Sequence, residues 1–299
     1  MKKRNLFALV LCLVLAMCLI AGCGGAGGGN GEGHGDTSYD SAKDIIVVTR
    51  ESGSGTRGAF IELFKVEVRD GSNKKDMTTP EAITTNKTDV MLTTIAGNEY
   101  AIGYVSVGSL NNSVKALKVD GAAAGAENIK SGAYKISRPF IVGTKGTVSG
   151  LSEDFIAFVM SKEGQAVVSA NNYVEVAGSA AAYSGDKPSG KLVVAGSSSV
   201  TPVMEKLKEA YEEINTDAKI EIQMTDSSAG IRALLDGTCD LAMSSRELTS
   251  EEAAQIDATV IAMDGIAVIV SKDNPTTDVT SEQVRQVFTG EVTTWDKIQ

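Results

Sequence analysis

Hydrophobic and polar positions follow one another along this 299-residue chain in a pattern that predicts strands and helices in turn. Short apolar runs typical of covered strands lie at 45–48, 100–105, 192–195, 219–224 and 266–270. An apolar stripe of helical spacing follows Thr201-Pro202, which we expect to supply an N-cap and a first-turn proline. Thr249 and Thr280 begin capping-box patterns, and another apolar helix is expected over 155–168. The alternation predicts an α/β fold.

The first 22 residues have the pattern of a bacterial lipoprotein signal peptide. A basic start precedes an apolar run over 6–20, which is shorter than a full membrane span. The run ends in Ile-Ala-Gly-Cys at 20–23, which resembles a lipobox, where cleavage before the cysteine accompanies attachment of a diacylglyceryl group and palmitate. We therefore expect lipidation of Cys23 and anchoring on the extracytoplasmic face of the cell membrane. An unmodified signal peptide cleaved nearby is the alternative.

Residues 23–43 are rich in glycine, serine and acidic side chains, and they contain too few apolar residues to form a core. We expect a flexible tether there. Its His34 is the single histidine of the sequence, and a lone histidine in such a segment predicts no metal site. Two cysteines would leave with the signal and Cys23 would be lipidated, so Cys239 remains as a buried structural thiol without a disulfide partner.

The charge balance argues against nucleic acid as a partner. The formal net charge is −10, and loss of Lys2, Lys3 and Arg4 with the signal leaves 25 basic against 38 acidic side chains, or −13. A negative chain that binds an anion must use short-range, directed donors, because its long-range field repels the ligand. Salt should therefore affect anion binding only weakly.

Residues 45–60 combine a buried-strand pattern, a Ser-Gly-Ser-Gly-Thr turn and the start of a helix. The glycines allow close approach of the backbone to a ligand, and N–H groups of the turn and helix start are free to bind an anion. Arg50 adds a planar donor group that suits tetrahedral oxyanions. The segment predicts a small-anion site, and an ordinary helix cap beside a solvated arginine is the alternative.

Three further segments repeat this pattern of a strand that ends in hydroxyl residues. They lie at 192–202, 225–231 and 240–247, and the last includes a second arginine, Arg246. Four independent helix caps do not explain four such segments well. We therefore expect the hydroxyl-rich strand ends to share one polar site.

An exported serine hydrolase is the main enzymatic alternative, because Ser54 lies on a sharp turn between strand and helix. The nucleophile elbow needs Gly-x-Ser-x-Gly, but Ser52 and Thr56 occupy the two glycine positions. A Ser-His-Asp triad also lacks its histidine, since His34 lies in the tether. No His-Glu-x-x-His or Walker-type motif is present in the sequence. These features argue against an enzyme.

Taken together, these segments resemble the PstS phosphate-binding proteins of phosphate ABC importers, over essentially all of 44–299. Further matches lie at 101–105, 138–140, 264–270, 288–291 and 294–295. The resemblance implies a two-lobed α/β protein of the type II periplasmic-binding fold, with the ligand cleft between the lobes. It also implies a monomer that binds inorganic phosphate, uses no cofactor or metal, and delivers phosphate to ABC permease subunits. A sensor or receptor for sulfate or molybdate is the alternative on the same fold.

The order of the matching segments differs from the family pattern, in which the segment matched by 196–200 opens the mature chain. We interpret this as a circular permutation, with the polar segment 183–191 joining the usual termini. One lobe would then comprise 44–135 and 263–299, the other 136–262, and the hinge would lie near 136 and 262. A piece of a tandem or cut gene whose halves pair between chains is the alternative.

The resemblance also implies a set of phosphate-binding residues. In the first lobe these are Arg50, Ser54, Gly55 and Thr56, and in the second they are Ser198, Ser199, Val200, Ser227 and Ser245. Between Ser198 and Ser199 we prefer Ser199 as the direct contact. Arg246 is either a further cationic contact or a surface residue paired with Glu247.

Ser245 stands where some members of the family have an aspartate that accepts the proton of hydrogen phosphate. Such an obligate acceptor rejects deprotonated sulfate, because an unpaired buried lone pair costs about 1–3 kcal/mol. The sequence leaves the acceptor here open among the Ser245 oxygen, Glu247 and a backbone carbonyl.

Overall fold

The structure is a computed structural model that describes residues 39–70, 73–148 and 150–298. The predicted signal peptide, Cys23 and His34 lie outside these residues. Within them, no helix is long and apolar enough to cross a membrane. The last residues of the predicted tether pack against the fold: the Tyr39 ring stacks on Tyr100 at 5.1 Å, and Asn274 Nδ2 donates to the Tyr39 hydroxyl at 2.9 Å.

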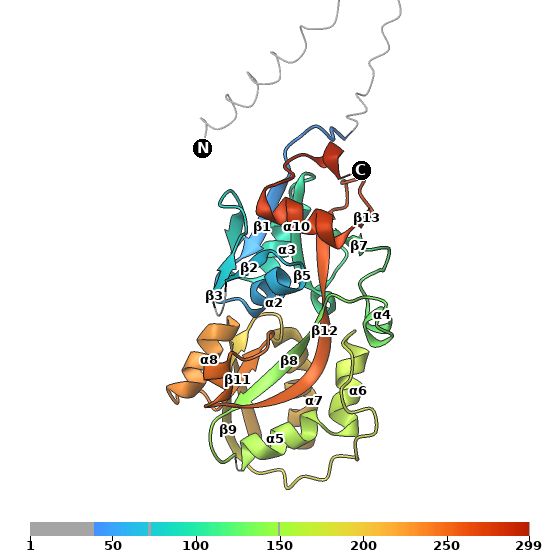
Figure 1. Cartoon of the computed structure of the whole chain (residues 1–299). Helices are drawn as coiled ribbons and strands as arrows, with labels where there is room; N and C mark the ends of the chain where they lie inside the picture. Colours follow the sequence, from blue (N-terminus) through green and yellow to red (C-terminus); the bar gives the residue numbers. More distant parts are fainter. Residues whose placement is uncertain (1–38, 71–72, 149, 299) are drawn as a thin grey trace, which may run out of the picture. The chain divides into compact units, whose positions relative to one another are not determined.

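A mixed sheet of nine strands forms the centre of the described part of the chain (Figure 1). Its order is β10-β9-β11-β8-β12-β5-β1-β4, and β6 pairs with β12 beside this path. The strands are β1 (Ile46–Arg50), β4 (Ile83–Thr85), β5 (Ala101–Ser106), β6 (Val114–Ala116), β8 (Ser137–Thr144), β9 (Gly190–Ser197), β10 (Ala218–Thr225), β11 (Leu241–Ser244) and β12 (Asp257–Ser271). Two small sheets pair β2 (Glu67–Asp70) with β3 (Asn73–Asp76) and β7 (Lys118–Val119) with β13 (Asp278–Val279).

Helices connect and cover these strands. They are α2 (Gly55–Leu63), α3 (Thr88–Ala96), α4 (Ala126–Lys130), α5 (Leu151–Val159), α6 (Lys162–Ala170), α7 (Thr201–Ile214), α8 (Ser227–Leu235), α9 (Ser250–Ala253) and α10 (Ser281–Thr289), with 3₁₀ turns η1 (Val107–Ser109) and η2 (Trp295–Lys297). The capping boxes predicted at Thr249 and Thr280 are both formed. All five predicted strands are present, and the α/β class is confirmed.

Two local predictions were wrong. The single helix expected over 155–168 is two helices, because the Ser161 side chain accepts from the Gly164 amide and starts α6 afresh. Thr201 is the first residue of α7 rather than its N-cap, and its hydroxyl donates backward to the Ser197 carbonyl at 3.0 Å. Proline does stand in the first turn, as predicted.

The described chain forms two lobes, each with a large hydrophobic core and a smaller apolar cluster, and Figure 1 shows the lobes joined by the long strands β8 and β12. One core includes Phe60, which stacks on Tyr104 at 3.9 Å. The other includes Phe155, Phe158 and Tyr211. Because β12 runs from the second lobe into the first and β8 pairs antiparallel with its residues 257–265, these two strands carry the connection between the cores.

The polar segment 183–191 is fastened to its lobe by one buried carboxylate. Tyr183 and Tyr211 both donate to Asp154 Oδ2, the latter at 2.6 Å, and the Asp186 amide donates to Oδ1 at 2.9 Å. Burial raises the pKa of Tyr211 to about 12, so this hydroxyl keeps its proton and remains a donor. The segment is therefore a docked connection within one lobe.

Candidate anion-binding site

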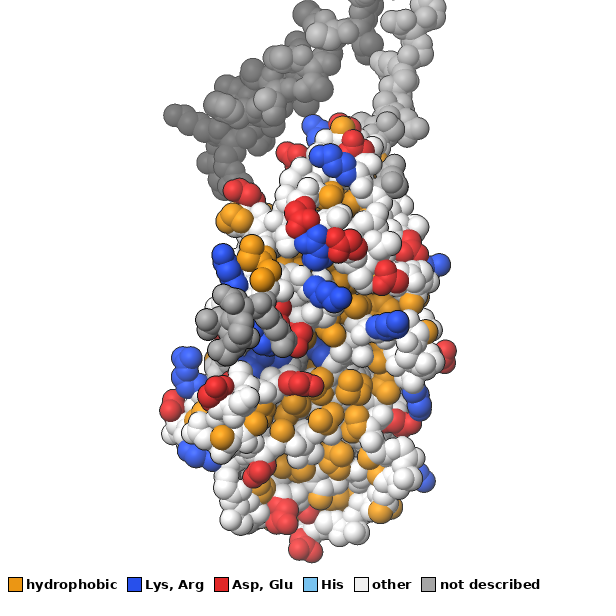
Figure 2. All heavy atoms as spheres, in the orientation of Figure 1, with side chains coloured by type: hydrophobic (Ala, Val, Ile, Leu, Met, Phe, Trp, Pro, Cys, Tyr) orange, Lys and Arg blue, Asp and Glu red, His pale blue; other side chains and the backbone are white. Residues whose placement is uncertain are grey.

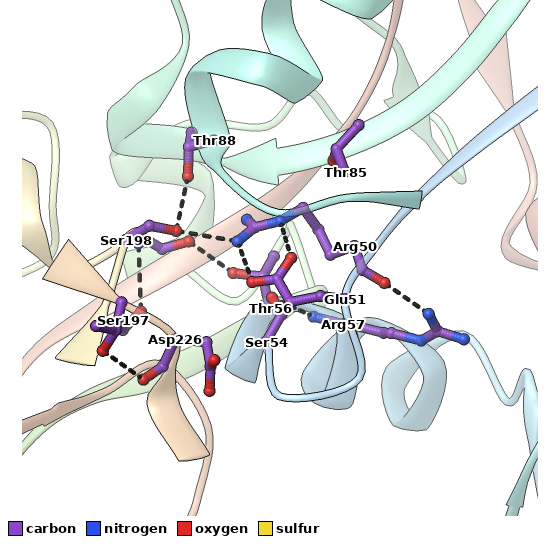
Figure 3. A network of polar contacts seen from close by, with 12 residues as sticks. Arg50, Glu51, Ser54, Thr56, Arg57, Thr85, Thr88, Ser197, Ser198 and Asp226 are labelled. Carbon is purple, nitrogen blue, oxygen red and sulfur yellow. Dashed lines mark hydrogen bonds and ion pairs between the residues drawn. The ribbon is translucent and has the colours of Figure 1, made fainter. Parts of the chain in front are cut away.

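The four hydroxyl-rich segments meet between the two lobes, as the sequence predicts. The end of β1 and the start of α2 come from one lobe, and the ends of β9, β10 and β11 come from the other. Figure 3 shows Ser198 lying between Arg50 and Thr88. In the space-filling view, Lys and Arg side chains lie in the hollow between the lobes (Figure 2).

Arg50 is the cationic centre of this site, although its side chain is only 3% exposed. Its Nε and Nη2 donate to the Glu51 carboxylate at 2.9 and 2.8 Å, and Nη2 also donates to Ser198 Oγ at 3.0 Å. The backbone is held as well, since Arg57 Nη1 donates to the Arg50 carbonyl at 2.6 Å and the Arg50 amide donates to the Tyr104 hydroxyl at 3.2 Å. The guanidinium and its backbone are thus both held by hydrogen bonds within the protein.

Hydroxyl groups from the two lobes contact each other directly. The Thr56 and Ser199 hydroxyls lie 2.6 Å apart, and the Ser198 hydroxyl lies 3.3 Å from that of Thr88. A backbone contact joins the same segments, because the Ser228 amide donates to the Gly53 carbonyl at 3.3 Å. Each hydroxyl can donate or accept, so the set can rearrange its hydrogen bonds around an oxyanion.

Three serines of the second lobe form a compact group opposite Gly55. Ser197 Oγ donates to Ser245 Oγ at 2.9 Å, and the Ser245 amide donates to Ser227 Oγ at 3.1 Å. A Cβ on Gly55 would lie 2.4 Å from Ser227 Oγ and 2.7 Å from Ser245 Oγ. No side chain fits at this position, so glycine permits the close approach of the two lobes.

Four helices begin at this junction: α2, α3, α7 and α8. Ser54 caps α2 by accepting from the Arg57 amide at 3.3 Å, which leaves its hydroxyl hydrogen available to another acceptor. Asp226 caps α8 by accepting from the Ala229 amide at 2.8 Å. Helix N-termini carry a partial positive charge and unpaired N–H groups, which favour anions. The site therefore combines one guanidinium with helix ends and hydroxyls, which suits a small oxyanion.

Arg246 forms an ion pair with Glu252, and not with Glu247, the partner considered from the sequence. Its Nη1 and Nη2 donate to the two carboxylate oxygens of Glu252 at 2.7 and 2.8 Å, and Nη1 also donates to the Glu247 carbonyl at 2.8 Å. Nη2 lies 3.3 Å from Ser228 Oγ, so the side chain still borders the site. The hydrogen bonds from Arg246 hold the pKa of Glu252 below its ordinary value.

Sequence reasoning missed three residues of this region: Glu51, Thr88 and Arg138. Thr88 follows a threonine-rich stretch after a strand, so the hydroxyl pattern used elsewhere would have found it. Glu51 adjoins Arg50, but an acidic neighbour by itself does not indicate an ion pair. Arg138 was noted as part of a motif, yet its contact with the Ser245 carbonyl at 2.9 Å depends on distant segments.

Comparison with known proteins places these features in a family. A profile described as the PBP superfamily domain matches residues 37–163 and 181–298. Phosphate-binding protein PstS 2 of Streptococcus agalactiae serotype V is 48% identical over 302 residues, which cover 100% of this chain and 99% of that protein. Phosphate-binding protein PstS 2 of Streptococcus pneumoniae serotype 4 is 45% identical over 88% of this chain and 90% of its own length.

A solved structure agrees with these relatives. The crystal structure of a phosphate ABC transporter, phosphate-binding protein from Streptococcus pneumoniae TIGR4 superposes with a TM-score of 0.69 at 45% identity, covering 86% of this chain and 100% of that one. The two-lobed binding-protein fold is confirmed. The alignment with the Streptococcus agalactiae protein runs nearly end to end, so that relative shares the segment order. The circular permutation stays a prediction.

Proposed function

This chain belongs to the PBP superfamily and, within it, to the PstS phosphate-binding proteins, and we propose that it captures inorganic phosphate for an ABC importer. Capture would take place between the lobes, followed by delivery to the permease subunits. The observation that carries the proposal is Arg50, a buried guanidinium that bonds a hydroxyl of the opposite lobe at 3.0 Å. A tetrahedral oxyanion is the ligand class that this guanidinium and the surrounding hydroxyls suit.

The contacts proposed for phosphate are those expected from the sequence. Arg50, Ser54, Gly55 and Thr56 would act from one lobe, and Ser198, Ser199, Val200, Ser227 and Ser245 from the other. The hydroxyl contacts between lobes support this set, because Thr56 meets Ser199 and Arg50 meets Ser198. Closure of the lobes would complete the site. We take 44–135 with 263–299 as one lobe and 136–262 as the other.

The proposed location follows from the family and from the start of the sequence. Substrate-binding proteins of ABC importers act outside the cytoplasm, and the lipobox pattern ending at Cys23 would hold this one on the outer face of the cell membrane. We propose that it works there as a lipid-anchored monomer. Mass spectrometry of the membrane fraction would show diacylglycerol on Cys23, and a Cys23→Ala variant would lack this group.

Selection of phosphate over sulfate needs an acceptor for the one proton of hydrogen phosphate. Glu247 is exposed, and Ser245 offers a neutral hydroxyl oxygen that already accepts one hydrogen bond, from Ser197. Glu51 fits the role better, since Arg50 Nη2 bonds both its carboxylate at 2.8 Å and Ser198 Oγ at 3.0 Å. A carboxylate offers about four acceptor sites, of which Arg50 uses two. We propose Glu51 as that acceptor.

Isothermal titration calorimetry of the mature protein, freed of bound phosphate, tests both proposals. Saturable one-to-one heat with phosphate and none with sulfate is the expected result. Heat with sulfate alone would support the alternative oxyanion receptor. The absence of a binding heat with both anions would contradict the proposed function.

The Glu51→Gln variant tests the acceptor specifically. Because glutamine keeps the shape but adds donors, we expect phosphate affinity to fall about tenfold, the size of one lost hydrogen bond to a charged group, and sulfate heat to appear. Glu252→Gln is the matched control, since Glu252 also binds an arginine through both oxygens but is not a proposed phosphate contact. An unchanged phosphate-to-sulfate ratio in Glu51→Gln would reject the assignment.

A further inference from the structure

A buried ion pair marks the place where the two connecting strands leave one core and enter the other. On β8, Ile136 just before the strand belongs to the first core and Phe140 to the second, and Arg138 lies between them. On β12, Ala262 belongs to the second core and Ile266 to the first, and Asp264 lies between them. The two charged residues are direct partners in the antiparallel register.

This pair is enclosed by protein. The side chains of Arg138 and Asp264 are 2% and 0% exposed, and Arg138 Nη2 lies 3.1 Å from Asp264 Oδ2. Burial lowers the pKa of Arg138 and raises that of Asp264, and the charge of each partner opposes the shift of the other. Removal of either charge alone would leave the other uncompensated in the interior.

Each residue of the ion pair makes a further hydrogen bond, Asp264 to the first lobe and Arg138 to the second. Asp264 Oδ1 accepts from Ser106 Oγ at 2.9 Å, at the end of β5 in the first lobe. Arg138 Nη1 donates to the Ser245 carbonyl at 2.9 Å, directly after β11 in the second lobe. A continuous polar chain therefore runs from Ser106 through the connecting strands to Ser245.

Ser245 links this chain to the candidate anion site. Its amide donates to Ser227 Oγ, and its hydroxyl accepts from Ser197 Oγ, so its position sets that of two other serines. Arg138 holds the third polar group of the same residue, the carbonyl. An anion bound by these serines would thus respond to the geometry of Arg138 without touching it.

We propose that Arg138, held by Asp264, is a positioning residue that fixes the Ser245 segment for anion binding and ties it to the strands connecting the lobes. The proposal rests on the proposed function for its affinity readout. The planar guanidinium bonds the carboxylate and the carbonyl in two directions at once. A lysine ammonium retains the charge beside Asp264 but cannot reproduce that fork.

The decisive variant is therefore Arg138→Lys, studied in the mature protein by two measurements. Calorimetry should show phosphate affinity lowered about tenfold, the size of one lost hydrogen bond to a charged group. Hydrogen exchange without phosphate should show faster exchange of the amides at 244–247. Ser106→Ala removes only one hydrogen bond from Asp264 and serves as the second variant if the lysine protein does not fold. It should change both readouts in the same direction by a smaller factor.

Asp154→Asn is the control for a merely structural role. It removes a buried carboxylate that binds Tyr183 and Tyr211 within the second lobe, away from Ser245. It should lower the melting temperature and leave phosphate affinity and exchange at 244–247 unchanged. If Arg138→Lys and Ser106→Ala behave like this control, the positioning role is wrong. If the wild-type protein binds no phosphate, the proposed function fails, and exchange at 244–247 still decides the role of Arg138.

Discussion

Arg50 and Arg138 occupy two equally buried places in the molecule and differ in what surrounds them. Both guanidiniums bind a carboxylate, but the Glu51 side chain is 21% exposed whereas that of Asp264 is 0% exposed. Arg50 directs another bond at a hydroxyl of the opposite lobe, and Arg138 directs its own at a backbone carbonyl. The comparison teaches that burial of an arginine does not reveal its role. The role is revealed by the groups that accept hydrogen bonds from the N–H groups not used in the ion pair.

Replacement of Arg138 should have the largest effect of these variants, and this effect should be on the stability of the fold. Arg138→Met leaves Asp264 buried without its charge partner, so we expect the free energy of unfolding to fall by about 3–5 kcal/mol. Urea denaturation followed by circular dichroism measures this. A loss below about 1 kcal/mol, typical of surface ion pairs, would contradict the importance of the buried pair.

Arg50→Ala should have its main effect on binding. The variant loses the only side-chain cation proposed to contact phosphate, so we expect affinity to fall at least about a hundredfold, near the upper range for a charged hydrogen bond. The fold should persist, because Glu51 retains access to water. Calorimetry and a thermal melt measure the two effects. Retained micromolar phosphate binding would show that Arg50 does not bind the anion.

Gly55→Ala tests how closely the two lobes approach. The added Cβ would lie 2.4 Å from Ser227 Oγ, so either the serine or the lobe must move. Overpacking of this kind costs about 1–3 kcal/mol, and we expect a loss of affinity near tenfold. Gly237→Ala is a control, since nothing lies within 4 Å of its Cβ, although its positive φ of 71° will lower stability. Equal phosphate affinity in both variants would mean that the lobes do not meet at Gly55.

The smallest effect concerns salt. Binding by directed donors in a chain of net charge −10 should depend little on ionic strength. Between low and high sodium chloride, we expect phosphate affinity to change by less than about threefold, since buried pairs are screened much less than exposed ones. Calorimetry across a chloride series measures this. A steep loss of affinity would indicate that long-range attraction to exposed lysines contributes.

Local patterns predicted much of the fold. The five apolar runs became strands, and both capping boxes formed, because strand alternation and cap hydrogen bonds act over a few residues. The prediction of one helix over 155–168 was wrong because Ser161 offered a competing cap inside an apolar stripe. Strand β8 escaped prediction because Pro139 interrupts its pattern, although the strand pairs on both sides with β11 and β12.

The sequence by itself determined the α/β class, the hydroxyl-rich strand ends and Arg50 as the cation of a candidate anion site. Tertiary structure decided which side chains meet. Arg50 reaches Ser198 across 148 positions of the chain, and Arg138 reaches Ser245 across 107. Such contacts depend on how two lobes pack around β8 and β12, and no short-range pattern carries that information. The assignment of one arginine to the site and another to the connecting strands therefore needed the folded chain.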